Sequence, residues 1–226
     1  MLRAPADLTG AQHFSMAFAI KRTYPDRKQK HVALLYKDEA SNWVLLHLGW
    51  HHLLFHEPWD GKYHWVAFDN LAPEVAEGFT DMARIIADQQ ANKKIPYSVT
   101  FTGGQYFGED GVYVRHGAGE GLTCATFLLA IFRRWGLPLV DESTWPQGRS
   151  GDAPWALKIV RGLYRWAKLE KAAIPLQHYI EQLRQRWALT RFRPEEVCAC
   201  AGIFDGNPLA FATVSPRAEK LLRDLP

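Results

Sequence analysis

The most constraining segment of the chain is residues 119–136, GEGLTCATFLLAIFRRWG, where a glycine-rich loop runs directly into a strongly apolar stretch. The stretch from about Thr123 to Trp135 has helical length, and Gly136 and Pro138 follow it as stop signals. Apolar residues occupy all sides of this helix, so it must be enclosed by other elements. We therefore expect a sheet and further helices to pack around it.

The residues before this helix have the pattern of antiparallel strands separated by short polar turns. We expect strands over 13–20, 31–36, 43–55 and 64–68, a charged connection over 21–30, and turns at 37–42 and 57–63. A helix is expected from Pro73 to about Ala91, since a proline suits a first helical turn. The segment IPYSVTF (95–101) then leads into the glycine-rich loop at 102–121. The fold class expected is α+β, with an antiparallel sheet packed on the buried helix.

The chain changes character after residue 140. Residues 141–154 are rich in Pro, Gly, Ser and acids, which indicates a linker. Apolar residues then recur at helical spacing over 155–166 and 176–187, and Ser215-Pro216 followed by Glu219 predicts the start of a last helix. We expect a core at 1–140, a linker at 141–154 and a mostly helical extension at 155–226 that packs on the core.

Composition bounds the class of protein. The chain has 226 residues, of which 47% are hydrophobic and 23% charged, values typical of a globular domain. A formal charge of +3 is too small to indicate nucleic-acid binding, and three cysteines do not make a disulfide framework. The first twenty residues lack the pattern of a signal peptide, and the longest later apolar run, at 125–132, is too short to span a membrane. The expected compartment is the cytoplasm, where thiols stay reduced.

Cys124 stands where the glycine-rich loop meets the buried helix. Unsatisfied N–H groups and the partial positive charge of a helix N-terminus stabilise a thiolate, and the same N–H groups can donate to an oxyanion. This placement indicates a nucleophile. It is equally typical of an ordinary core cysteine, because cysteine is among the most buried residue types.

Two histidines strengthen the catalytic interpretation. His31 opens one predicted strand and His47 lies on its expected partner; both are odd-numbered, so a regular hairpin projects them on the same face. A thiol nucleophile needs one imidazole as base and a third group that orients it. His51 has the same parity as His47 and is its rival as the orienting residue. Histidines in strands are otherwise commonly surface or hydrogen-bonded core residues.

The order HVALLY, WVLLHLG and then LTCATFLLAIF resembles the circularly permuted NlpC-type papain-like cysteine hydrolases and their lecithin:retinol acyltransferase-like relatives, over roughly residues 13–136. IPYSVTFTGG (95–104) is similar to a segment of that family whose tyrosine lies near the oxyanion site. The resemblance implies His31 as base, His47 as orienting residue, Cys124 as nucleophile and Tyr97 as oxyanion donor. Thr123 and His51 complete the candidate oxyanion or substrate-binding set.

Three other patterns in the sequence could indicate a metal, redox or membrane-binding site. His52 and His56 have helical metal-ligand spacing but lie in a strand or turn, so no metal or other cofactor is expected. Cys198 and Cys200 lack the second pair of a zinc site and favour a partly buried helix or strand. The basic and aromatic helix at 155–169 suits either contact with a membrane surface or a solvated face on a docked helix.

The function expected from the sequence is hydrolysis of an amide bond in a peptide or peptidoglycan-like substrate through an acyl-enzyme on Cys124, without a nucleic-acid partner. Two alternatives stay open: a thioesterase or acyltransferase acting on acyl lipids with the same residues, and a non-enzymatic interaction protein that retains the fold.

Overall fold

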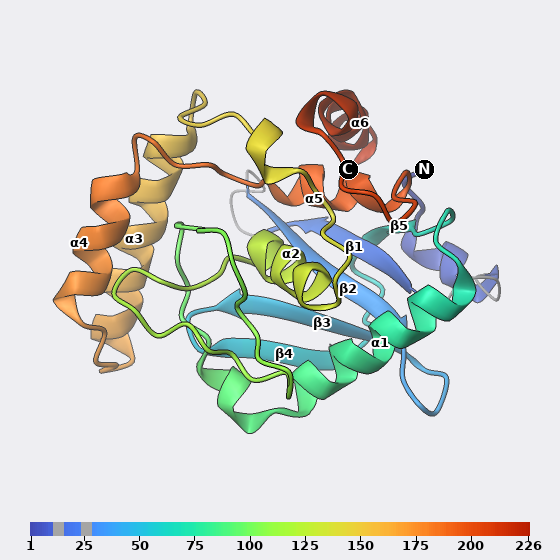
Figure 1. Cartoon of the computed structure of the whole chain (residues 1–226), viewed down its shortest axis with the longest axis horizontal. Coiled ribbons are helices and arrows are strands. Elements are labelled where there is room, and N and C mark those ends of the chain that lie inside the picture. Colours follow the sequence, from blue (N-terminus) through green and yellow to red (C-terminus); the bar gives the residue numbers. More distant parts are fainter. Residues whose placement is uncertain (11–15, 24–28) are drawn as a thin grey trace.

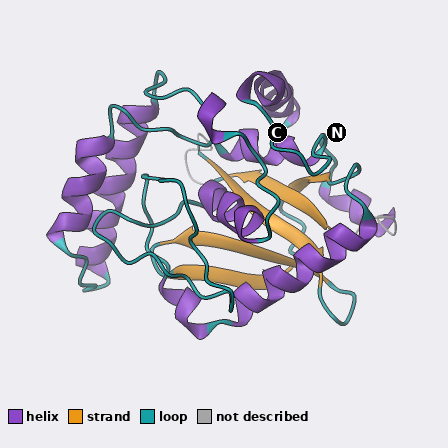
Figure 2. Ribbon diagram, viewed as in Figure 1, coloured by secondary structure: helices purple, strands orange, loops and turns teal. Residues whose placement is uncertain are grey.

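The computed structural model describes residues 1–10, 16–23 and 29–226, and it has the expected α+β architecture (Figure 1). A five-stranded antiparallel sheet in the order β4-β3-β2-β1-β5 forms its centre, and helices pack against it (Figure 2). The strands are β1 (Met16–Arg22), β2 (Lys30–Lys37), β3 (Trp43–Trp50), β4 (Leu53–Pro58) and β5 (His64–Ala67). The α-helices of the described residues are α1 (Pro73–Asp88), α2 (Cys124–Arg134), α3 (Asp152–Leu169), α4 (Leu176–Gln185), α5 (Pro194–Ala201) and α6 (Phe211–Asp224).

The prediction of one continuous strand over 43–55 is wrong. The chain reverses at His51 and His52, which separate β3 from β4, and the two strands pair with each other. His52 adopts a left-handed backbone conformation with φ of 59°, and the β3–β4 register shifts between Leu48 and Trp50. Apolar residues flank the two histidines on both sides, and the turn itself contains no Pro, Asn, Asp or Gly, so the sequence pattern did not reveal it. Residues 13–15 of the first predicted strand lie outside the described residues.

Helix α2 is enclosed as expected, because it lies across β2 and β3 and every residue from Cys124 to Phe132 is buried (Figure 1). The even-numbered residues of β2, such as Val32 and Leu34, belong to the large core on this face of the sheet. The odd-numbered residues Ala33 and Leu35 belong to a smaller core on the opposite face. The alternation of a strand therefore separates two apolar layers.

The C-terminal residues are part of the same layered structure. Helix α5 packs on β1, β2 and β5 beside α2, and Cys198 and Cys200 on it are fully buried. Within the expected linker, half of the residues are exposed, but Trp145 and Asp152 are buried and fix it against the rest of the structure. Asp152 opens α3, so that helix begins three residues earlier than its apolar stripe indicates.

The last helix also begins earlier than predicted. Helix α6 starts at Phe211 and carries Pro216 inside it, whereas Ser215 and Pro216 resemble a helix start. A proline removes a backbone hydrogen bond from a helix interior. Burial of Val214 and Leu221 against the core offsets that cost. No helix in the described part of the chain is long and apolar enough to cross a membrane.

Candidate active site

The site lies where β2 and β3 separate. The two strands pair only from Leu34 opposite Leu46 to Lys37 opposite Trp43. Residues 30–33 of β2 and 47–50 of β3 therefore lack pairing with each other, and we call this gap the β2–β3 opening. Strands that separate before their ends leave backbone groups available to side chains. Cys124 contacts the Val32 backbone at this opening, and His31 and His47 lie on the strand segments that border it.

Cys124 is the first residue of α2 and is 5% exposed. Its helix start is built by reciprocal capping: the Thr123 hydroxyl accepts a hydrogen bond from the Thr126 N–H at 3.2 Å, and the Thr126 hydroxyl accepts from the Thr123 N–H at 2.7 Å. The sulfur reaches the β2–β3 opening, where it is hydrogen-bonded to the backbone of Val32, the residue after His31. Thr123 thus acts as the N-cap and also lines the cavity beside the thiol.

The sequence predicts a stabilised thiolate, but the structure indicates a neutral thiol. Burial raises the pKa of Cys124 to about 11, although backbone hydrogen bonds from Val32, Ala125 and Cys124 itself act to lower it. The expected thiolate is therefore wrong for the site as it stands. The cause is that the helix tip is covered rather than open to water, so desolvation outweighs the helix dipole.

The two predicted imidazoles are in contact. His31 Nε2 and His47 Nδ1 are 3.0 Å apart, which confirms that both side chains project from the same face. His47 Nε2 lies 3.2 Å from the carboxylate Oε1 of Glu57 on β4. A carboxylate only accepts hydrogen bonds, so Nε2 of His47 carries the proton and its Nδ1 accepts. His31 must then donate from Nε2, which leaves its Nδ1 unprotonated and able to take a proton.

The surroundings keep both imidazoles neutral. Burial lowers the pKa of His31 well below its ordinary value, and the nearby His47 and Lys21 act in the same direction. Burial also lowers the pKa of His47, while the hydrogen bond and charge of Glu57 oppose that shift. Lys21 lies opposite His31 in the sheet, with its ammonium 4.0 Å from the ring centre of Tyr63. The His31–His47 pair is therefore neutral. His31 is the candidate base, and His47 accepts its hydrogen bond while donating to Glu57.

The thiol and the imidazoles approach the β2–β3 opening from different sides. Cys124 belongs to the large core beneath α2, whereas His31 and His47 contact Tyr63 of the opposite core, with ring centres 6.3 and 6.4 Å apart. Burial is the main cause that raises the pKa of Tyr63, and an ionised Cys124 would add to that shift, so the sulfur lies near the Tyr63 hydroxyl. No hydrogen bond joins the thiol to either imidazole within the described ranges.

Tyr97 lies against the N-terminus of α2. Its hydroxyl is hydrogen-bonded to the backbone N–H of Cys124, and burial is the main cause that raises its pKa well above the ordinary value. The segment of Tyr97 forms a bridge with Leu122. A Cβ atom on Gly121 would lie 2.5 Å from the Pro96 carbonyl oxygen, so this close approach requires glycine. The glycine-rich loop thus holds Tyr97 against the helix tip.

His51 does not orient His31. Its Nδ1 accepts a hydrogen bond from the Tyr97 N–H at 3.1 Å, while His178 Nε2 lies 3.0 Å from the Tyr97 carbonyl. His51 and His178 therefore position the backbone of Tyr97 rather than contacting substrate. His56 lies 2.9 Å from the Tyr36 hydroxyl, and His52 stacks against His51. No group of three or more metal-binding side chains was found among the described residues.

A small cavity adjoins the thiol. Its volume is about 50 Å³, and its walls include Cys124, Tyr97, Lys30 and, from the C-terminal extension, Trp155 and Arg191. The basic side chains Lys158, Arg161, Arg165 and Lys168 lie on the exposed side of the same helix as Trp155. The C-terminal extension therefore completes the wall of the site.

The sequence interpretation missed Glu57 and Arg191. Glu57 was assigned to a turn, yet it lies in β4 on the same face as His47, and its odd number is the only signal that could have indicated it. Arg191 stands alone between two helices and carries no local signal. Of the predicted set, Cys124, Tyr97 and Thr123 line the cavity at the start of α2, His31 and His47 contact each other beside the β2–β3 opening, and His51 is hydrogen-bonded to the Tyr97 backbone.

None of the family models, curated proteins and solved structures compared with this chain matches it.

Proposed function

We propose that this protein is a cysteine hydrolase of permuted papain-like architecture that cleaves an amide bond through an acyl-enzyme on Cys124. One observation carries the proposal: a hydrogen-bonded chain from Glu57 through His47 to His31, which leaves the His31 Nδ1 unprotonated, borders the same opening where the Cys124 sulfur contacts the backbone of Val32. A structural role alone does not require a buried thiol, a buried histidine pair and a helix tip to share one gap between strands.

The first half of the reaction forms the acyl-enzyme. The Cys124 proton passes to His31 Nδ1 as the sulfur bonds to the substrate carbonyl carbon, and the carbonyl oxygen becomes an oxyanion. The Cys124 N–H and the Tyr97 hydroxyl donate to that oxygen once Tyr97 releases the N–H. The carbon–nitrogen bond then breaks, and the leaving amine takes the proton from His31. The product is a thioester on Cys124.

The second half returns the enzyme to its starting state. Water attacks the thioester carbon and gives a proton to His31. The carbon–sulfur bond breaks, the acid is released, and Cys124 recovers its proton from His31. In both halves His47 accepts a hydrogen bond from the His31 imidazolium, and the negative charge of Glu57 stabilises the hydrogen-bonded pair.

The separation of thiol and base suits an enzyme without substrate. Hydrogen bonds between catalytic groups are commonly long in such states and shorten when substrate binds. The neutral thiol also suits this scheme, because His31 must remove its proton during attack rather than before it. The preference for an amide comes from the sequence resemblance.

The test is acylation by p-nitrophenyl acetate, followed by mass spectrometry of the intact protein and of its peptides. We expect a burst of nitrophenol and one acetyl group on Cys124. Replacing His31 with Gln, which can still donate to His47 but cannot act as base, should slow acylation by about 10²- to 10⁴-fold. Cys198→Ala is the matched control because that cysteine lies on the buried face of α5 and is fully buried.

Acetylation that persists in Cys124→Ala, or an unchanged acylation rate in His31→Gln, would reject the proposal. A peptide-amide library then separates amidase from esterase activity, since only an amidase releases new amines from it.

A further inference from the structure

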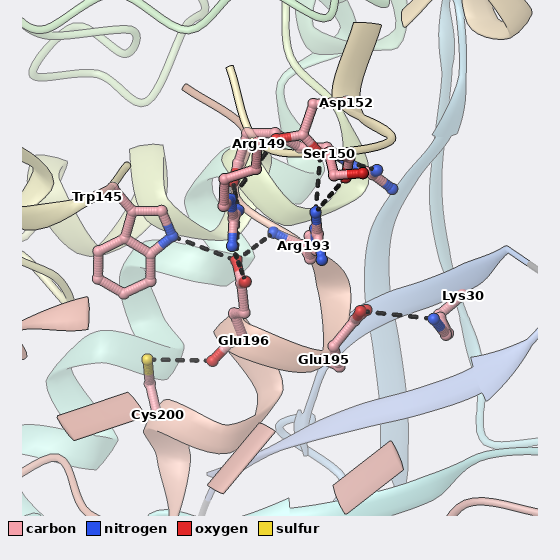
Figure 3. Close-up of polar contacts among 10 residues, drawn as sticks. Lys30, Trp145, Arg149, Ser150, Asp152, Arg193, Glu195, Glu196 and Cys200 are labelled. Atoms are coloured by element: carbon pink, nitrogen blue, oxygen red, sulfur yellow. Dashed lines mark hydrogen bonds and ion pairs between the residues drawn. The ribbon is translucent and has the colours of Figure 1, made fainter. Parts of the chain in front are cut away.

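A cluster of charged side chains that the proposed reaction does not use is shown in part in Figure 3, and its members Lys30 and Arg191 line the cavity beside Cys124. Glu196, at 4% exposure, bonds Arg149 and accepts from the Trp145 N–H at 3.2 Å. Asp152 accepts from Arg193 at 3.0 Å and from Arg191 at 3.3 Å. Lys30 pairs with Glu195 at 3.4 Å.

The charges of this cluster do not cancel. Four cations face three carboxylates, which leaves one positive charge in excess; the members are Lys30, Arg149, Arg191, Arg193, Asp152, Glu195 and Glu196. The three carboxylates are buried, whereas the four cations are 15–28% exposed, so the excess positive charge is partly desolvated and is stabilised by a partner of opposite sign. The excess therefore favours binding of an anion.

Arg191 places positive charge in the wall of the cavity beside the Cys124 thiol. Its guanidinium carbon stacks 3.9 Å from the ring centre of Trp155, and both residues line the cavity. Arg191 has one ion pair, with Asp152, and its Nε is buried without a hydrogen-bond partner. Its charge also acts on Cys124 and on Tyr97, which places it close to the reacting atoms.

The size of the cavity limits what can enter. About 50 Å³ corresponds to roughly four water molecules, so a carboxylate fits and a long side chain does not. Lys30 supplies a second cation on the same wall. An arginine stacked on an aromatic ring is well suited to a planar anion, because the ring fixes the plane of its donors.

We propose that this cavity binds a carboxylate that the substrate carries close to the carbonyl attacked by Cys124, with Arg191 and Lys30 as its cationic partners. The inference rests on the proposed function and names its substrate class: acyl compounds with a negative charge near the scissile bond. Arg191 and Lys30 then determine specificity, and neither takes part in proton transfer.

The test compares two alkylating reagents of similar size, iodoacetate and iodoacetamide, at pH 9. Their rate constants on Cys124 are measured by peptide mass spectrometry in the native protein and in urea. For each condition, the rate constant for iodoacetate is divided by the rate constant for iodoacetamide. Dividing the native quotient by the quotient in urea removes the intrinsic difference in reactivity between the two reagents. We expect a normalised ratio of about ten in the native protein, from one charge-assisted interaction, and a value near one in Arg191→Gln.

Three variants control for other effects. Arg193→Gln removes a charge from the same cluster but not from the cavity, so its ratio should stay within about twofold of the original. Arg191→Lys retains the charge and should keep most of the preference. Lys30→Met lowers the ratio independently, which keeps the test decisive if Arg191→Gln does not fold. An effect of Arg191 on thiol ionisation alone would change both rates equally and leave the ratio constant.

A ratio near one in the native protein, with normal acetylation of Cys124, overturns this inference and leaves the proposed function standing. A ratio that does not respond to Arg191→Gln or Lys30→Met overturns it as well. If neither reagent nor p-nitrophenyl acetate modifies native Cys124, both proposals fail together.

Discussion

The pH at which Cys124 ionises is the most direct measure of how strongly the site is desolvated. The perturbation is pH, raised from 7 to 10.5 in the presence of iodoacetamide, which reacts with thiolates. Burial raises the pKa of Cys124 to about 11 from an ordinary 9.0. Cys198 and Cys200 are fully buried, and burial raises the pKa of both further. Native labelling should therefore occur first at Cys124.

The expected rate follows from two opposing effects. A shift of two pKa units lowers the thiolate fraction at pH 8 about 100-fold relative to an ordinary thiol. A thiolate of higher pKa is more nucleophilic, by about 6- to 10-fold over two units. Together these predict labelling at least roughly tenfold slower than for Cys124 in the unfolded chain. The narrow cavity slows it further.

The assay is peptide mass spectrometry of alkylated Cys124 as a function of pH, with the same protein in urea as reference. The native rate should rise about tenfold per pH unit up to pH 10 without a plateau, whereas the unfolded chain should reach half its maximal rate near pH 9 and its plateau above about pH 10. The shape of the profile does not depend on how accessible the cavity is. A native plateau below pH 8 would refute the burial argument and indicate a preformed thiolate–imidazolium pair.

Three further predictions concern the acceptor chain, the acid limit and the charge cluster. Glu57→Ala should slow acetylation of Cys124 about tenfold in the burst assay, since it removes the charge that stabilises the imidazolium; an unchanged burst rate would remove Glu57 from the mechanism. Burial lowers the pKa of His51 to about 3 from 6.5, so the unfolded chain binds more protons between these values and stability should fall as pH falls through that range. His51→Asn, which can still accept from the Tyr97 N–H, should lose less stability between pH 7 and pH 4 in urea titrations, and equal loss would contradict this. Glu196→Ala should lower the free energy of unfolding by about 3–5 kcal/mol and Tm by roughly 6–20 °C. The control Asp69→Ala, which removes one member of an exposed ion pair, should lower it by less than about 1 kcal/mol. Similar losses in the two variants would show that burial of the cluster contributes nothing.

Local patterns in the sequence predicted the elements well where one periodicity dominates. The buried helix at Cys124 and the contact of His31 with His47 both follow from spacing alone, because side chains alternate in strands and apolar residues surround an enclosed helix. The turn at His51 and His52 was missed because apolar residues flank it on both sides and it contains no Pro, Asn, Asp or Gly; the left-handed conformation of His52 marks the reversal only in the structure.

The chemistry of the site depended on contacts between distant parts of the chain. Glu57 reaches His47 only because β4 folds back on β3, and Arg191 reaches the cavity only because the C-terminal extension packs on the core. Neither contact leaves a periodic signal in the sequence.

The sequence by itself determined most of the strand residues, which helix is buried and where the candidate nucleophile stands along the chain. Only the tertiary structure decided the charge of that nucleophile and the groups it faces. The reason is physical: periodicity depends on neighbours a few residues apart, whereas the cost of ionising Cys124 depends on how much water the packed layers exclude.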